Sequence, residues 1–123
     1  MHDTKNFRVS EFACKCCGGN KIDQRVIDMA QTIREYLNMP VRVNSGYRCE
    51  KHNAAVGGVK GSKHTKGCAC DLSCGCGNVK LFEAVKELYA AGKLPELDYA
   101  IRYKWGVHID CGGKRNSRWE IRG

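Results

Sequence analysis

Three side chains that can bind a divalent metal lie in the second half of the chain: His64, Asp71 and His108. The first two belong to the stretch SKHTKGCACDL, residues 62–72, and the third belongs to GVHID, residues 106–110. Two imidazoles and one carboxylate form a catalytic zinc set in which the fourth position stays open for water. Taken singly, each has an ordinary alternative, because a histidine beside a strand is often only hydrogen-bonded and an aspartate after a turn often binds backbone amides.

Two helices are predicted from apolar spacing. Residues 20–40 carry apolar side chains three and four positions apart and end before a proline, which indicates an amphipathic helix built on Ile22, Val26, Met29, Ile33 and Leu37. A second helix is expected to begin with Asn78 as its N-cap and to stop at Gly92. Its apolar face consists of Leu81, Phe82, Val85, Leu88 and Tyr89.

Five short segments have the composition of strands: residues 40–45, 68–73, 98–103, 106–111 and 118–122. Together with the two helices they predict an α+β fold, a small and mostly antiparallel sheet with helices packed on one face. The length fits a single domain over residues 1–123. If the strands at 68–73 and 106–111 are neighbours, His64, Asp71 and His108 converge. The long Gly- and Lys-rich loop at 46–67 is expected to be functional.

The blocks SGYRC, HNAAVGG, SKHTKGCACD and GVHID, in this order, resemble the D-Ala-D-Ala carboxypeptidase-like family of zinc peptidases. That family includes L-alanyl-D-glutamate endopeptidases used as phage endolysins, and its pattern is SGYR, then S-x-H-x-x-G-x-A-x-D, then H-x-D. The resemblance runs from about Phe7 to Trp119. It implies one catalytic Zn²⁺ bound by His64, Asp71 and His108, and hydrolysis of an amide bond in peptidoglycan stem peptides or cross-links.

The resemblance also suggests catalytic and substrate-binding residues. Arg48 is expected to hold a substrate carboxylate, or the carbonyl near the cleaved bond, because a guanidinium binds such groups through two parallel hydrogen bonds. The alternative is a surface arginine that closes a turn. Ser62 either orients the substrate or caps the turn before His64.

The general base is not given by the family pattern at its usual position. Many family members have an acid three residues before the last histidine, where this chain has Trp105. We expect Asp110 to take the role, because residues two apart on a strand share a face with each other. The alternative for Asp110 is support of a histidine ligand. The acids at Glu96, Asp98 and Glu120 become candidates only if the fold brings them back to this site.

Nine cysteines are many for a chain of 123 residues. Their odd number, and an N-terminus without an apolar leader, favour thiols or metal ligands over a disulfide framework. Cys14, Cys17 and Cys49 are candidates for a second, structural zinc site, since the first two have C-x-x-C spacing. Redox catalysis is disfavoured because no thioredoxin-like context surrounds that pair.

The chain carries a formal net charge of +8 and has a pI near 9.1, which favours anionic partners such as bacterial walls. No nucleic-acid motif and no apolar run of about 20 residues is present, so neither a specific nucleic-acid partner nor a membrane span is expected. We expect a monomer, made in the cytoplasm without a signal peptide, that acts on the cell wall after release or is packaged in a virion. The alternatives are a non-catalytic wall-binding or virion structural member of the same fold, and a zinc-binding nucleic-acid module.

Overall fold

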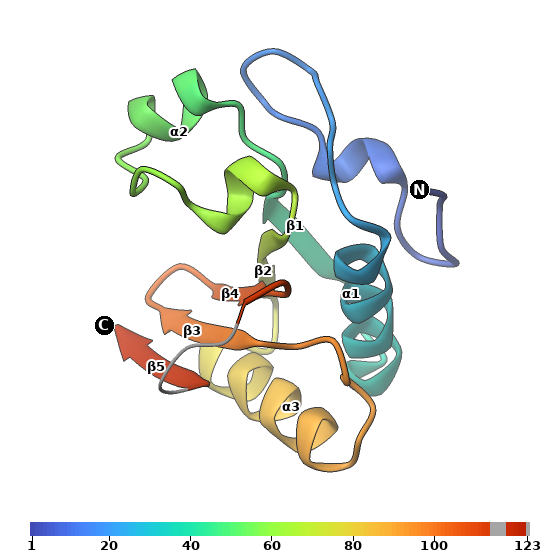
Figure 1. Ribbon diagram of the computed structural model, residues 1–123. Helices are drawn as coiled ribbons and strands as arrows, with labels where there is room; N and C mark the ends of the chain where they lie inside the picture. The colour runs from blue at the N-terminus through green and yellow to red at the C-terminus, as the bar shows by residue number, and fades with distance from the viewer. Residues whose placement is uncertain (114–117, 123) are drawn as a thin grey trace.

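The computed structural model describes residues 1–113 and 118–122 (Figure 1). Its helices are α1 (Gln24–Leu37), α2 (Glu50–Ala55) and α3 (Asn78–Ala90), with 3₁₀ turns η1 (Val9–Phe12) and η2 (Lys63–Lys66). Its strands are β1 (Val41–Ser45), β2 (Ala69–Cys74), β3 (Tyr99–Tyr103), β4 (Val107–Asp110) and β5 (Trp119–Arg122).

The five strands form one sheet in the order β1-β2-β4-β3-β5. All neighbouring pairs are antiparallel except β3 and β5, which run parallel. The five strand segments and the mostly antiparallel α+β fold that the sequence predicted are therefore confirmed. The strands at 68–73 and 106–111 are indeed neighbours, because β2 pairs with β4.

The sheet has one face for the core and one for polar chemistry. Cys70 and Leu72 of β2 and Val107 and Ile109 of β4 belong to the same apolar cluster as the inner faces of α1 and α3. Figure 1 shows these two helices on the same side of the sheet, apart from α2. Because side chains alternate along a strand, the residues between these apolar positions face the other way. That alternation directs the acids and histidine of β2 and β4 away from the core.

Helix α1 begins and ends as its sequence suggests. The Asp23 carboxylate accepts a hydrogen bond from the Arg25 backbone amide at the start, and Asn38 ends the helix in the left-handed conformation, with a φ of 51°. This helix has 14 residues. Among the described residues, no helix is both long enough and apolar enough to cross a membrane.

The start of α3 differs from the prediction. Gly77, with a φ of 90°, is the N-cap, and Asn78 is the first helical residue. The side-chain amide of Asn78 donates a hydrogen bond of 3.0 Å to the Tyr103 carbonyl oxygen and another to the Lys104 carbonyl oxygen. It thereby binds the turn between β3 and β4 instead of capping its own helix, a long-range contact that local sequence does not reveal.

The segment predicted as a loop at 46–67 contains both α2 and η2. The Cys49 sulfur caps α2 by accepting the His52 amide, and the Ser62 hydroxyl caps η2 by accepting the His64 amide. Both helical pieces are too short to show a 3.6-residue apolar period, and cysteine is an unusual cap. Their caps, and not an amphipathic pattern, define them.

Gly67 allows the turn from η2 into β2 to pass very close to the chain before α1. Its φ is 73°, and a Cβ atom at this position would lie 1.8 Å from the Lys21 carbonyl oxygen. The Gly67 carbonyl accepts a hydrogen bond of 2.8 Å from the Asp23 amide. The turn that leads into β2, the strand of Asp71, is thus fixed against the start of α1.

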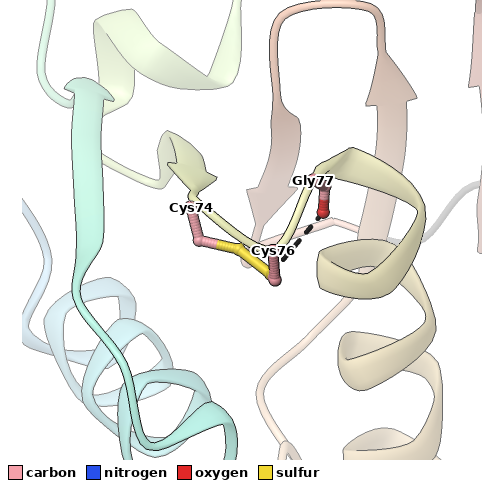
Figure 2. The surroundings of a disulfide bond; sticks show 3 residues. All are labelled: Cys74, Cys76 and Gly77. Atoms are coloured by element: carbon pink, nitrogen blue, oxygen red, sulfur yellow. Dashed lines mark hydrogen bonds between the residues drawn. A yellow bond between two sulfur atoms is a disulfide. The ribbon is translucent and has the colours of Figure 1, made fainter.

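A disulfide joins Cys74 at the end of β2 to Cys76, just before α3 (Figure 2). The Cys76 sulfur lies 3.6 Å from the Gly77 carbonyl oxygen. The remaining cysteines are free thiols. The preference for thiols over a disulfide framework therefore holds for seven of the nine cysteines and is wrong for this pair, whose Cα atoms are only 5.3 Å apart.

Replacing Gly67 by alanine should destabilise the protein far more than the same change at Gly92. Both glycines have a φ near 74°, but a Cβ at Gly92 meets no atom within 4 Å. We expect Gly92→Ala to lower the free energy of unfolding by about 1 kcal/mol, because alanine is strained in the left-handed backbone conformation but meets no other atom there. Gly67→Ala adds a backbone clash and should cost about 3 kcal/mol or more. Urea denaturation measures both, and equal losses would contradict the close approach to Lys21.

Candidate metal centre

Adjacent strands and one 3₁₀ turn place the three predicted ligands together. Asp71 of β2 and His108 of β4 are direct register partners, so their side chains leave the same face of the sheet side by side. His64 reaches them from η2, whose cap is Ser62. All three side chains are nearly inaccessible to solvent.

The distances between the three ligand atoms match those of a tetrahedral zinc site. His64 Nε2 lies 3.2 Å from His108 Nδ1 and 3.2 Å from Asp71 Oδ1, and His108 Nδ1 lies 3.0 Å from Asp71 Oδ1. Ligands about 2.0–2.1 Å from a tetrahedral zinc ion are separated from each other by about 3.3 Å. Only a small expansion is needed to admit the ion.

In each imidazole, the nitrogen that points away from the other two ligands, here called the outer nitrogen, has its own hydrogen-bond acceptor. His64 Nδ1 lies 2.8 Å from the Gly46 carbonyl oxygen, and His108 Nε2 lies 2.8 Å from Asp110 Oδ2. These partners assign the protons to the outer nitrogens. The inner nitrogens, His64 Nε2 and His108 Nδ1, then present lone pairs towards Asp71 Oδ1. Three electron-pair donors facing one point fit a divalent cation, and the nitrogen and oxygen ligands suit zinc.

The pKa shifts at the centre favour a negative carboxylate beside positive charge. Burial alone would raise the pKa of Asp71, but in the absence of a metal His108 and His64, when each ring carries a second proton on its inner nitrogen, donate hydrogen bonds to it and hold it well below its usual range. Burial would likewise lower the pKa of His108, but Asp110 and Asp71 raise it above the ordinary value. A bound cation would satisfy the same electrostatic preference.

Arg48, predicted to bind substrate, also holds the metal-binding carboxylate. Its guanidinium donates to Asp71 Oδ2 at 3.1 Å, to Asn53 Oδ1 at 3.1 Å and to the Ser45 hydroxyl at 3.0 Å. The Arg48 side chain is 14% exposed and lines the cleft above the centre. Because Arg48 engages Oδ2, Asp71 is left with Oδ1 directed at the histidines. The substrate-binding role of Arg48 stays a prediction.

Asn53 is a residue of the site that the sequence analysis did not single out. It is buried, accepts from Arg48, and donates a hydrogen bond of 2.9 Å to the Val59 carbonyl oxygen. A Cβ at Gly58 would lie 2.1 Å from Asn53 Oδ1. The quoted block HNAAVGG contained this signal, since it places the asparagine five residues before a glycine that must make room for it.

Asp110 lies behind His108 and away from the three ligand atoms. It is fully buried, accepts from the outer nitrogen of His108, and is not among the residues that line the cleft. This position favours the alternative named above, support of a histidine ligand, over the role of general base. Ser62 lines the cleft and also caps η2, so its hydroxyl has the capping role and its contact with substrate stays a prediction.

The other acids considered as bases have partners elsewhere. Asp98 accepts the Gly113 amide at 2.6 Å, and Glu96 lies 3.7 Å from Arg25. Glu120 forms an ion pair with Arg122 and is the register partner of Ile101, which itself pairs with His108. The fold therefore returns Glu120 to the sheet face of the centre, but two strand spacings, about 10 Å, separate it from His108.

An open cleft lies above the three ligands. Tyr103 and Trp105 stack on its rim, with ring centroids 4.6 Å apart and planes 10° from parallel. Among the described residues that line the cleft, Asp71 is the only carboxylate, while three are cationic: Arg48, Lys63 and Arg122. The cleft thus combines a metal-binding floor, a cationic lining and an aromatic rim.

Comparison with known proteins finds a family for most of the chain. A protein-family model described as Peptidase M15 matches residues 5–110, a range that includes His64, Asp71 and His108. A search of curated proteins finds no significant match.

Replacing Asp110 by asparagine should weaken metal binding without unfolding the protein. The amide keeps the size of the side chain but removes the charged acceptor that orients His108, so we expect the zinc affinity to fall about 10-fold or more. Competition with a chromophoric chelator measures the zinc affinity. The His64→Ala variant, which loses this site, is the control. Unchanged zinc affinity together with a loss of turnover of about 100-fold would instead support the general-base role.

Proposed function

The chain belongs to the Peptidase M15 family of zinc-dependent metallopeptidases, and we propose that it hydrolyses an amide bond in peptidoglycan stem peptides or cross-links. The observation that carries this proposal is the convergence of His64, Asp71 and His108 at the floor of an open cleft. When bound there, zinc acts as a Lewis acid towards the scissile carbonyl and makes hydroxide available near neutral pH.

The chain's own residues hold this centre in a defined state. The Gly46 carbonyl and the Asp110 carboxylate fix the proton on the outer nitrogen of each imidazole. Arg48 engages the second oxygen of Asp71, which leaves one carboxylate oxygen for the ion. With three protein ligands, a bound zinc ion would keep one position open for water, and the cleft above the three residues would give a peptide access to it.

The lining of the cleft supports an anionic peptide as substrate. Lys63 and Arg122 lie on it with Arg48, and guanidinium groups bind carboxylates through paired hydrogen bonds. Stem peptides of peptidoglycan carry free carboxylates, and the stacked rings of Tyr103 and Trp105 offer a flat apolar surface beside them. In our proposal Arg48 and Ser62 contact the substrate from the side of η2.

We also propose that the protein is an endolysin-type enzyme of a phage or prophage, released to the wall or carried in a virion. The resemblance to phage endopeptidases and the net charge of +8 support this role, because a cationic protein is attracted to anionic walls.

One observation favours a second candidate function, a non-catalytic member that only binds walls. Trp105 occupies the position where many family members have an acid, and the described lining of the cleft contains no carboxylate other than Asp71. Such a protein would retain the fold and the zinc but would release no peptide.

Digestion of purified cell walls tests the proposed function. We expect the zinc-loaded protein to liberate amino groups, and mass spectrometry of the resulting muropeptides to identify the bond that is cut. The His64→Ala variant, measured in parallel, should release none, since two ligands do not hold a catalytic zinc. Binding to walls without release of amino groups by the zinc-loaded protein would support the non-catalytic alternative. Equal release by His64→Ala would contradict the metallopeptidase mechanism.

Arg48→Lys should lower kcat/KM at least 10-fold while the protein stays folded. An ammonium group cannot reach Asp71, Asn53 and Ser45 at once as the planar guanidinium does. The matched control is Arg42→Lys on β1, where the side chain is exposed, and it should keep wild-type kinetics. Wild-type kinetics for Arg48→Lys as well would show that neither Asp71 nor the substrate depends on the guanidinium fork.

A further inference from the structure

A second group of metal-binding side chains lies outside the cleft, where the N-terminal segment meets the start of α2. The sulfur atoms of Cys14, Cys17 and Cys49 all lie within 4.8 Å of one another. Cys14 is buried, Cys17 is exposed, and Cys49 is intermediate. Residues 14 and 49 are far apart in the sequence, so tertiary structure, and not only local spacing, brings these thiols together.

The sulfur separation fits thiolates around a metal better than it fits a disulfide. Cys14 Sγ lies 3.7 Å from Cys49 Sγ. Thiolates about 2.3 Å from a tetrahedral zinc ion are about 3.8 Å apart, whereas a disulfide requires about 2.05 Å.

Each of the three sulfurs accepts a backbone N–H at 3.4 Å. The Cys49 amide donates to Cys14, the Gly19 amide to Cys17, and the His52 amide to Cys49. Such donors stabilise negative charge on sulfur, as a thiolate ligand requires.

Cys16 can supply a fourth ligand. It is exposed and lies between Cys14 and Cys17 in the same turn. The turn that carries it is closed by two backbone hydrogen bonds, Cys14 N–H to Gly19 O at 2.8 Å and Gly18 N–H to Cys14 O at 2.9 Å. Gly18 adopts a φ of 72°, which lets the chain fold back after the cysteines.

We propose that Cys14, Cys16, Cys17 and Cys49 bind a structural zinc ion in a closed tetrahedral site, independent of the metal in the cleft. Four cysteine thiolates form a common structural zinc site, and such a site keeps no open position for catalysis. This inference does not rest on the proposed function, because it uses only the thiol cluster and its hydrogen bonds.

An ion in this cluster would also restrain residues 46–49, the segment that positions the ligands of the centre in the cleft. Cys49 directly follows Arg48, which holds Asp71, and Gly46 supplies the carbonyl that fixes His64. The same segment is already joined to the N-terminal region by the Tyr47 amide, which donates to the Phe12 carbonyl at 2.8 Å. A zinc ion joining residues 14–17 to Cys49 would hold this segment in place.

Metal analysis of the full chain, purified with reductant and zinc, tests the proposal. We expect about two zinc ions per wild-type chain and about one each for His64→Ala and Cys17→Ser. Cys17 is exposed, so its replacement should leave the core intact. Cys68→Ser is the matched control: Cys68 lies outside the cluster, near Asp23 and Cys111, and the variant should keep about two ions.

Cobalt loading of the His64→Ala variant identifies the ligands directly. We expect strong near-ultraviolet absorption from thiolate-to-cobalt charge transfer, lost in the His64→Ala/Cys17→Ser double variant. Loss of an ion in Cys68→Ser but not in Cys17→Ser would overturn the assignment. A wild-type protein with a single zinc ion and a Cys14–Cys49 disulfide in its mass spectrum would also overturn it. Wall digestion by these proteins is scored separately, so failure of the proposed function would leave the metal counts interpretable.

Discussion

The arrangement of this protein depends on one constraint: three electron-pair donors, on the nearly inaccessible side chains of His64, Asp71 and His108, lie 3.0–3.2 Å apart. Lone pairs at this separation repel each other unless positive charge lies between them. A bound cation converts that repulsion into attraction, so metal binding and folding of the site are coupled. The ring partners Gly46 and Asp110 make the arrangement specific, since they keep the protons on the outer nitrogens.

The rest of the fold can be understood as support for this arrangement. The register of β2 and β4 places the acid beside one histidine, while Gly67 lets the turn that follows η2 lie against the start of α1. Arg48 then connects Asp71 to Asn53, and Gly58 leaves space for the asparagine amide. Each of these positions requires a small residue or a particular hydrogen-bonding group, which explains why the quoted blocks are rich in glycine and polar residues.

Much of the fold followed from periodicity in the sequence, because short alternating strands and an amphipathic helix such as Gln24–Leu37 are local features. The ligand set followed from a family resemblance and was not derivable from spacing alone. The role of Asn78 depends on a contact with a distant segment, which no local pattern encodes. The partners of Asn53 and Asp110 are near in sequence, but only the three-dimensional arrangement shows that these side chains support Arg48 and His108. The helix Glu50–Ala55 was missed for a different reason, since six residues capped by a cysteine give too little periodicity to recognise.

Anomalous diffraction at the zinc absorption edge, from crystals grown with stoichiometric zinc, tests the central claim most directly. We expect a peak about 2.0–2.2 Å from His64 Nε2, Asp71 Oδ1 and His108 Nδ1, with Asp71 Oδ2 still hydrogen-bonded to Arg48. Zinc bound only elsewhere in the protein, with no peak between these three atoms, would contradict it.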